Sequence, residues 1–157
     1  MDNINKILHH PKYKSLLEEL NELEKDREFC NHTLEHFLDV ARIAYITVLE
    51  QGLNYSKEVI YSIALLHDIG RVLQYKEGID HNEGSAIIAD ELLEETSFNK
   101  EEKDKIIKAI KAHRKESEDE LSRIIYKSDK LSRNCFNCKA YKECYWSEEK
   151  KNKIIKL

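Results

Sequence analysis

The sequence predicts a single all-α domain, and three observations support this fold class. The 157 residues include only four Gly and one Pro, which leaves few of the turn signals that strands need. Good helix formers, such as Leu, Ala, Glu and Lys, dominate long runs of the chain. Apolar residues recur at three- and four-residue steps over most of its length. With 41% hydrophobic residues, the chain can bury one core and is too short for two comfortable domains.

The first predicted helix spans residues 12–25, where leucines recur at helical spacing. His9 and His10 precede this segment, and we expect both to be solvated. A second helix is predicted over residues 32–51 by a repeated apolar stripe, and Gly52 is a plausible stop signal.

The central part of the chain contains further helix signals. Ser56 can cap a third helix, whose inward stripe is interrupted at residues 67–70 (His-Asp-Ile-Gly). Residues 80–83 (Asp-His-Asn-Glu) and 99–102 (Asn-Lys-Glu-Glu) each resemble a capping box, so we expect each to open a helix. A last helix fits residues 118–132.

Residues 133–157 have a different character, because their first part is aromatic, rich in cysteine and without helical periodicity. There is no repeat and no low-complexity linker before them. We therefore expect residues 1–132 to form the domain, including its N-terminal helix, and residues 133–157 to pack on it as a cysteine-rich tail.

Charge and hydropathy narrow the range of partners. The formal net charge of −4 is mild, so nothing global attracts a nucleic acid or an anionic membrane. No apolar stretch approaches the roughly 18 residues that span a bilayer, and the N-terminus lacks the pattern of a signal peptide. We expect a cytoplasmic protein; the sequence leaves its oligomeric state open.

Several histidines and aspartates take positions that a core residue would normally fill. His67 follows Ile63 and Ala64 at steps of four and three residues, so it faces inward from its helix. One inward histidine is usually a core residue with a backbone hydrogen bond. Burying many such groups separately costs about 1–3 kcal/mol for each unsatisfied group, and a shared cation removes that cost. By the same spacing, the other inward residues are His36, His81, His113 and Asp129.

These residues resemble the signature of a known family. His36 before Val40-Ala41, His67-Asp68 within LLHDIGR and Asp129 within YKSDKLS resemble the H…HD…D pattern of the HD superfamily of metal-dependent phosphohydrolases. The resemblance covers about residues 29–133 and implies a compact helical bundle in which these four residues bind a metal ion. His32 lies one helical turn before His36, and we expect it at the helix start near the surface or in support of the ligands.

The resemblance also implies a second metal ion. In HD proteins with two metals, further histidines fall between the HD pair and the last aspartate, in contexts similar to those of His81 and His113. These two would hold the second ion, with Asp68 bridging both. A mononuclear site with two nearby hydrogen-bonding histidines is the alternative. A shell of nitrogen and carboxylate ligands suits Fe, Mn, Zn, Co or Ni.

For function, the resemblance implies hydrolysis of a small phosphorylated substrate, foremost a nucleotide. Two ions can activate a water and bind phosphate oxygens during an in-line displacement. Arg71, Arg114 and Lys130 follow ligands directly and are candidates for phosphate contacts, although each can equally be a solvated cation at a helix end. Two other functions stay open: a mixed-valence di-iron oxygenase, since some HD enzymes with this ligand order activate oxygen, and a non-catalytic metal-bound sensor or binding module.

The cysteines form a separate pattern. Cys135, Cys138 and Cys144 have the spacing C-x2-C-x5-C, and Cys30 lies upstream of the predicted His36 helix. Four thiolates make a complete set for structural zinc or for a four-cysteine iron–sulfur cluster, with free thiols as the alternative. We expect Tyr145 and Trp146 to pack the tail onto the domain rather than to stack on a ligand.

Overall fold

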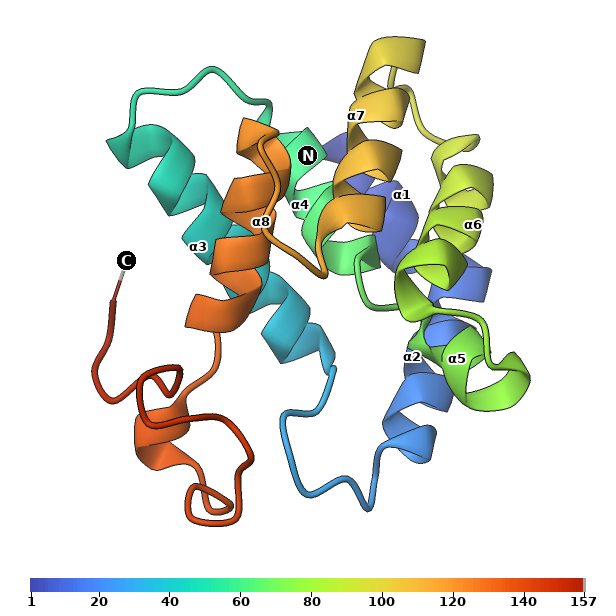
Figure 1. Ribbon diagram of the computed structural model, residues 1–157. Helices are drawn as coiled ribbons and strands as arrows, with labels where there is room; N and C mark the ends of the chain where they lie inside the picture. The colour runs from blue at the N-terminus through green and yellow to red at the C-terminus, as the bar shows by residue number, and fades with distance from the viewer. Residues whose placement is uncertain (157) are drawn as a thin grey trace.

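The computed structural model describes residues 1–156, which form eight α-helices, one short 3₁₀ helix and no strand (Figure 1). The predicted all-α fold is therefore confirmed. The helices are α1 (Asp2–His9), α2 (Pro11–Leu23), α3 (Leu34–Glu50), α4 (Lys57–Leu66), α5 (Arg71–Glu77), α6 (His81–Leu93), α7 (Lys100–Ala112), α8 (Glu120–Leu131) and the 3₁₀ helix η1 (Cys135–Asn137). None of the helices within these residues is long and apolar enough to cross a membrane.

Helix α4 lies at the centre of the bundle (Figure 1). Seven of its ten residues are buried, because its sequence is apolar on almost every side and such a helix must be covered all round. Helices α3 and α8 pack against one side of it, α7 and α6 against another, and α1 against its remaining face. The C-terminal end of α4, followed at once by His67-Asp68, is thereby carried into the interior of the domain.

The two predicted capping boxes have different outcomes. At α7, the Asn99 side chain accepts from Glu102 N and the Glu102 carboxylate accepts from Asn99 N, each at 3.0 Å, so this capping box is confirmed. At α6, the helix begins after Asp80 as predicted, but Asp80 makes no capping hydrogen bond, so the capping box itself was wrong. Asp80 instead faces Arg114 at 3.4 Å, and Glu83 faces Lys111 at 3.2 Å. Both carboxylates of the expected capping box, Asp80 and Glu83, therefore pair with cations at the end of α7 instead.

Two short helices, α1 and α5, were not predicted. Helix α1 buries Ile4 and Ile7, too few apolar positions to establish a period in the sequence. His9 is therefore the exposed last residue of a helix, not part of a segment before the first one. His10 is half-buried: its Nδ1 accepts from Lys12 N at 3.1 Å and caps α2, so the expectation that it is solvated was wrong.

The segment after α8 contains no α-helix within the described residues, only the turn η1. It lies beside the loop that joins α2 to α3 (Figure 1). Asn152 fastens it to the end of α8, since its Nδ2 donates to the carbonyl oxygens of Lys130 at 2.7 Å and of Arg133 at 2.8 Å. The buried Lys151 donates to Tyr141 O at 2.9 Å and closes the segment on itself.

Candidate metal centre

The turn after α4 places His67 and Asp68 in the middle of the bundle. His67 is fully buried, and its Nδ1 donates to Ala64 O at 2.7 Å, which turns Nε2 away from the helix. Gly70 ends the turn in direct contact with α6, where its N–H donates to Ser85 Oγ at 2.8 Å. A Cβ atom at Gly70 would lie 2.0 Å from Ser85 N, so only glycine allows this approach. The HD turn is thus held against the helix that begins with His81.

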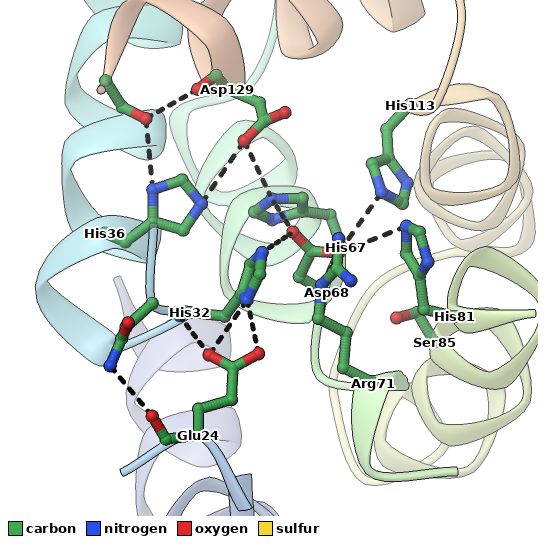
Figure 2. Close-up of polar contacts among 12 residues, drawn as sticks. Glu24, His32, His36, His67, Asp68, Arg71, His81, Ser85, His113 and Asp129 are labelled. Carbon is green, nitrogen blue, oxygen red and sulfur yellow. Dashed lines mark hydrogen bonds and ion pairs between the residues drawn. The ribbon is translucent and has the colours of Figure 1, made fainter. Parts of the chain in front are cut away.

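A first group of four buried donors gathers on one side of the turn: His36, His67, Asp68 and Asp129. One ligand atom from each lies within 4.8 Å of all the others, although the residues come from α3, the end of α4 and α8 (Figure 2). The Nε2 of His36 is 3.3 Å from Asp129 Oδ1, and that of His67 is 3.3 Å from Asp68 Oδ2. Two imidazole nitrogens and two carboxylates are a typical ligand set for a divalent transition metal.

A second group, Asp68, His81 and His113, gathers on the other side of the same carboxylate (Figure 2). The Nε2 atoms of His81 and His113 lie 3.4 and 3.5 Å from Asp68 Oδ1. The other carboxylate oxygen, Oδ2, faces the first group, where it lies 3.3 Å from His67 Nε2. Asp68 therefore presents one oxygen to each group, which is the arrangement of a carboxylate that bridges two ions.

The buried nitrogens of the site test whether a cation fits. The Nε2 atoms of His36 and His67, which face the carboxylates, have no hydrogen-bond partner. On His36 and His113, Nδ1 is engaged by Ser132 Oγ at 3.1 Å and by Ile110 O at 2.5 Å, which aims Nε2 at the carboxylates. Unpaired buried polar atoms cost about 1–3 kcal/mol each. A cation between these nitrogens and the carboxylates removes that cost, so the residues fit metal ions.

The protonation states also suit metal ions. Burial raises the pKa of Asp68, but the charge and hydrogen bond of His67 outweigh it and hold that pKa well below its usual range. Burial lowers the pKa of His36 to about 4 and that of His81 to about 3. Burial also lowers the pKa of His67, but Asp68 and Asp129 outweigh it and raise the value to about 9. The two carboxylates therefore demand positive charge at their centre, which divalent ions supply.

Comparison with known proteins agrees with this geometry. The family model described as HD domain matches residues 33–134, about two thirds of the chain and the span that holds all six donors. The chain belongs to the HD domain family. An uncharacterized protein from Clostridium beijerinckii (strain ATCC 51743 / NCIMB 8052) is 45% identical over 152 residues, covering 97% of both chains. The crystal structure of a predicted HD superfamily hydrolase from an uncultured Thermotogales bacterium is similar, with a TM-score of 0.63 and 25% identity over 90% of this chain and 82% of that one. The predicted membership is thus confirmed.

The sequence alone placed His32 beside the HD centre only as one of two alternatives, and Glu24 was not predicted there. His32 is 2% exposed, so the expected place near the surface was wrong, and the other expectation, a place beside the ligands, agrees with the structure. Its Nε2 lies 3.5 Å from Asp68 Oδ2, and its Nδ1 lies 2.7 Å from the buried carboxylate of Glu24 (Figure 2). Burial raises the pKa of Glu24, but the hydrogen bond and charge of His32 outweigh it and lower the value to about 2. Glu24 follows Leu20 by one helical turn, and that inward spacing was the signal available in the sequence.

A cleft of about 220 Å³ opens over the HD centre and has a basic lining. Arg71 donates from Nε to Asp68 Oδ1 at 3.0 Å, and Lys130 donates to Asp129 Oδ2 at 2.5 Å. Arg114 also lines the cleft, but it is 46% exposed and paired with Asp80. The structure thus brings all three predicted phosphate contacts to the cleft. The sequence analysis missed two further cations there, Arg27 and Arg133.

The four cysteines lie around one cavity beside the HD centre. Cys30, Cys135, Cys138 and Cys144 line one cavity of about 330 Å³, and none of them forms a disulfide. Within residues 1–156, neither group of closely spaced metal donors contains a cysteine. Tyr145 is 78% exposed, so the expectation that it packs the tail onto the domain was wrong for most of its side chain. Its aromatic contact is with Phe29 in the loop before α3, edge to face at 6.0 Å.

Proposed function

We propose that this HD-domain protein is a phosphohydrolase that binds two divalent metal ions, one on each side of Asp68, and acts on a nucleotide or another small phosphorylated molecule. The observation that carries the proposal is the sharing of Asp68 by two groups of donors beneath a basic cleft. Membership of the HD family and the likeness to a predicted HD superfamily hydrolase support metal-dependent hydrolysis as the general chemistry.

The two donor groups support a division of the ligands between the two ions. His36, His67 and Asp129 would hold the first ion and His81 and His113 the second, with Asp68 contributing to both. When bound, two such ions lower the pKa of a water molecule to make a hydroxide nucleophile and neutralise phosphate oxygens. The second group contains only three protein donors, which leaves room for water or substrate.

The pair of His32 and Glu24 is suited to proton transfer. The ionised Glu24 carboxylate accepts the Nδ1 proton of His32, so the neutral ring keeps an unprotonated Nε2. Burial lowers the pKa of His32, which favours this neutral form. The His32 ring also lines the cleft, with Nε2 directed at Asp68. His32 is therefore placed to accept a proton from an attacking water and to hand it to the leaving oxygen.

The lining of the cleft supports a small anionic substrate. Cations from four different parts of the chain line it, and charge-assisted hydrogen bonds from Arg and Lys are the usual means of binding phosphate. Its volume of about 220 Å³ suits a phosphate group with a small substituent. Phe29, Tyr145 and Trp146 form an aromatic border on which a nucleobase can stack. The cations that line the cleft are Arg27, Arg71, Arg114, Lys130 and Arg133.

The test is a phosphate-release screen of nucleotides and small phosphate esters, with Mn, Co, Ni, Fe or Zn added to protein purified without oxygen. We expect metal-dependent release that is lost in Asp68→Ala and kept in Asp104→Ala, an exposed aspartate on α7 remote from the cleft. Turnover that needs oxygen, with the magnetic signal of a mixed-valence iron pair, would indicate an oxygenase instead. Tight nucleotide binding without turnover would indicate a sensor.

A further inference from the structure

The cysteine cavity joins two distant parts of the chain. Cys30 lies in the loop before α3, whereas the other three cysteines belong to the segment after α8, more than a hundred residues later. All four thiols are free and all four line the same cavity of about 330 Å³. Four thiols from two segments around one space form a complete ligand set, not a chance surface cluster.

The spacing of the sulfurs distinguishes zinc from an iron–sulfur cluster. A tetrahedral zinc site with Zn–S bonds of about 2.3 Å holds its four sulfurs within about 4 Å of one another. In residues 1–156, no three of the cysteine sulfurs lie within 4.8 Å of one another, although the donors of the HD centre do. In a four-iron cluster each thiolate binds a different iron, so the sulfurs stand apart around an inorganic core that needs a cavity of its own. The geometry therefore favours the cluster.

Charged side chains of both signs line the cysteine cavity. Four thiolates around a four-iron core carry net negative charge, and the cavity lining includes the cations Arg133 and Lys151 as well as the carboxylates of Glu35 and Asp39. Lys151 is only 7% exposed, and its Nζ already donates to Glu148 Oε1 at 2.8 Å and to Tyr141 O at 2.9 Å.

The backbone at Cys30 is a further sign of a fixed role. Among the non-glycine residues described, only Cys30 has a positive φ, at 35°. A left-handed conformation costs a non-glycine residue about 1 kcal/mol or more, and such strain is typical of positions where a side chain must point in one direction.

We propose that Cys30, Cys135, Cys138 and Cys144 bind a four-iron, four-sulfur cluster that ties the C-terminal segment to the loop before α3. Cys30, Cys144 and Trp146 line both the cysteine cavity and the cleft over the HD centre. The cluster therefore fixes one wall of the substrate cleft. The proposal concerns a separate ligand set and does not depend on the reaction at the HD centre.

Acid-labile sulfide tests the proposal, because the HD centre can bind iron but holds no inorganic sulfide. Full-length protein, produced with added iron and purified without oxygen, should contain about four sulfides per chain. It should show broad visible absorption that dithionite bleaches. His67→Ala should lose metal from the HD centre and keep its sulfide, whereas Cys138→Ser should lose the sulfide.

Four results would overturn the proposal: one zinc ion per chain without sulfide, two sulfides per chain, disulfides between these cysteines, or four free thiols in a colourless protein. The sulfide content of the unmodified protein decides the matter even if Cys138→Ser fails to fold. Cys144 lines the cleft over the HD centre. In a folded Cys144→Ser variant we therefore also expect a raised KM for the substrate of that centre.

Discussion

Replacing Gly70 by alanine tests how the HD turn controls the position of α6. The added Cβ would lie 2.0 Å from Ser85 N, 2.4 Å from Gly84 C and 2.5 Å from His81 O. All three atoms belong to the backbone of α6, so no side chain can rotate away. Since Cβ atoms essentially never come closer than 3.0 Å, α6 must retreat from the turn by about 1 Å.

That displacement acts on His81, the first residue of α6. Its Nε2 now lies 3.4 Å from Asp68 Oδ1, within reach of an ion shared with that oxygen. Metal–ligand distances tolerate only about 0.2 Å of variation, so a shift of about 1 Å removes His81 from the second site. We expect weakened binding of the second ion, intact binding of the first, and activity reduced by about 100-fold. Forcing a methyl group into this contact should also lower the free energy of unfolding by about 1–3 kcal/mol.

Calorimetric titration of metal into the apoprotein measures the affinity of each of the two metal sites. Urea unfolding measures the free energy of unfolding. Gly78→Ala is the matched control, because nothing lies within 4 Å of its added Cβ. Its φ of 73° makes alanine unfavourable by about 1 kcal/mol, so that variant should lose stability and keep both metal affinities. If Gly70→Ala binds both ions with unchanged affinity and activity, the assignment of His81 to the second site is refuted.

Three further predictions concern residues outside the metal ligands. His32→Ala should lower kcat by about 10²–10⁴-fold with both ions retained, and Glu24→Gln should act in the same direction; loss of metal would instead make His32 a ligand. Arg71→Ala should raise the KM for a phosphorylated substrate in steady-state assays, and an unchanged KM would remove Arg71 from substrate binding. Asp119 caps α8, and its hydrogen bonds to Lys108 and to Ser122 lower its pKa to about 2. Because the folded-state pKa is depressed, its stabilisation is present above about pH 4 and is lost as the pH falls toward 2. Asp119→Ala should therefore cost about 1 kcal/mol near neutral pH in urea unfolding, and a loss that persists undiminished at pH 2 would contradict this account.

The inward positions of the donors could be predicted because helical spacing alone determines them. His67 continues the buried stripe of α4, and Asp129 lies on the buried face of α8, so each faces the core wherever its helix packs. The sequence could not show that Asp68 presents a different oxygen to each group. That arrangement depends on the turn after α4 and on the contact of Gly70 with α6.

The contacts that the sequence could not reveal join distant segments of the chain. His32 precedes α3 in a loop without periodicity, and it enters the site only because Glu24 at the end of α2 holds its ring. Asp80 has the sequence of a helix cap, but the end of α7 supplies Arg114 as a competing partner. Such tertiary interactions override a local pattern, and one sequence does not reveal them.

The most direct test of the central claim is the anomalous scattering of manganese in crystals of the full-length protein soaked with Mn²⁺. Data collected at the manganese absorption edge distinguish this ion from iron held by the cysteines. We expect two anomalous peaks beside Asp68, one near His36 and His67 and the other near His81 and His113. A single peak, or two peaks that do not share the Asp68 carboxylate, would contradict a dinuclear centre bridged by this residue.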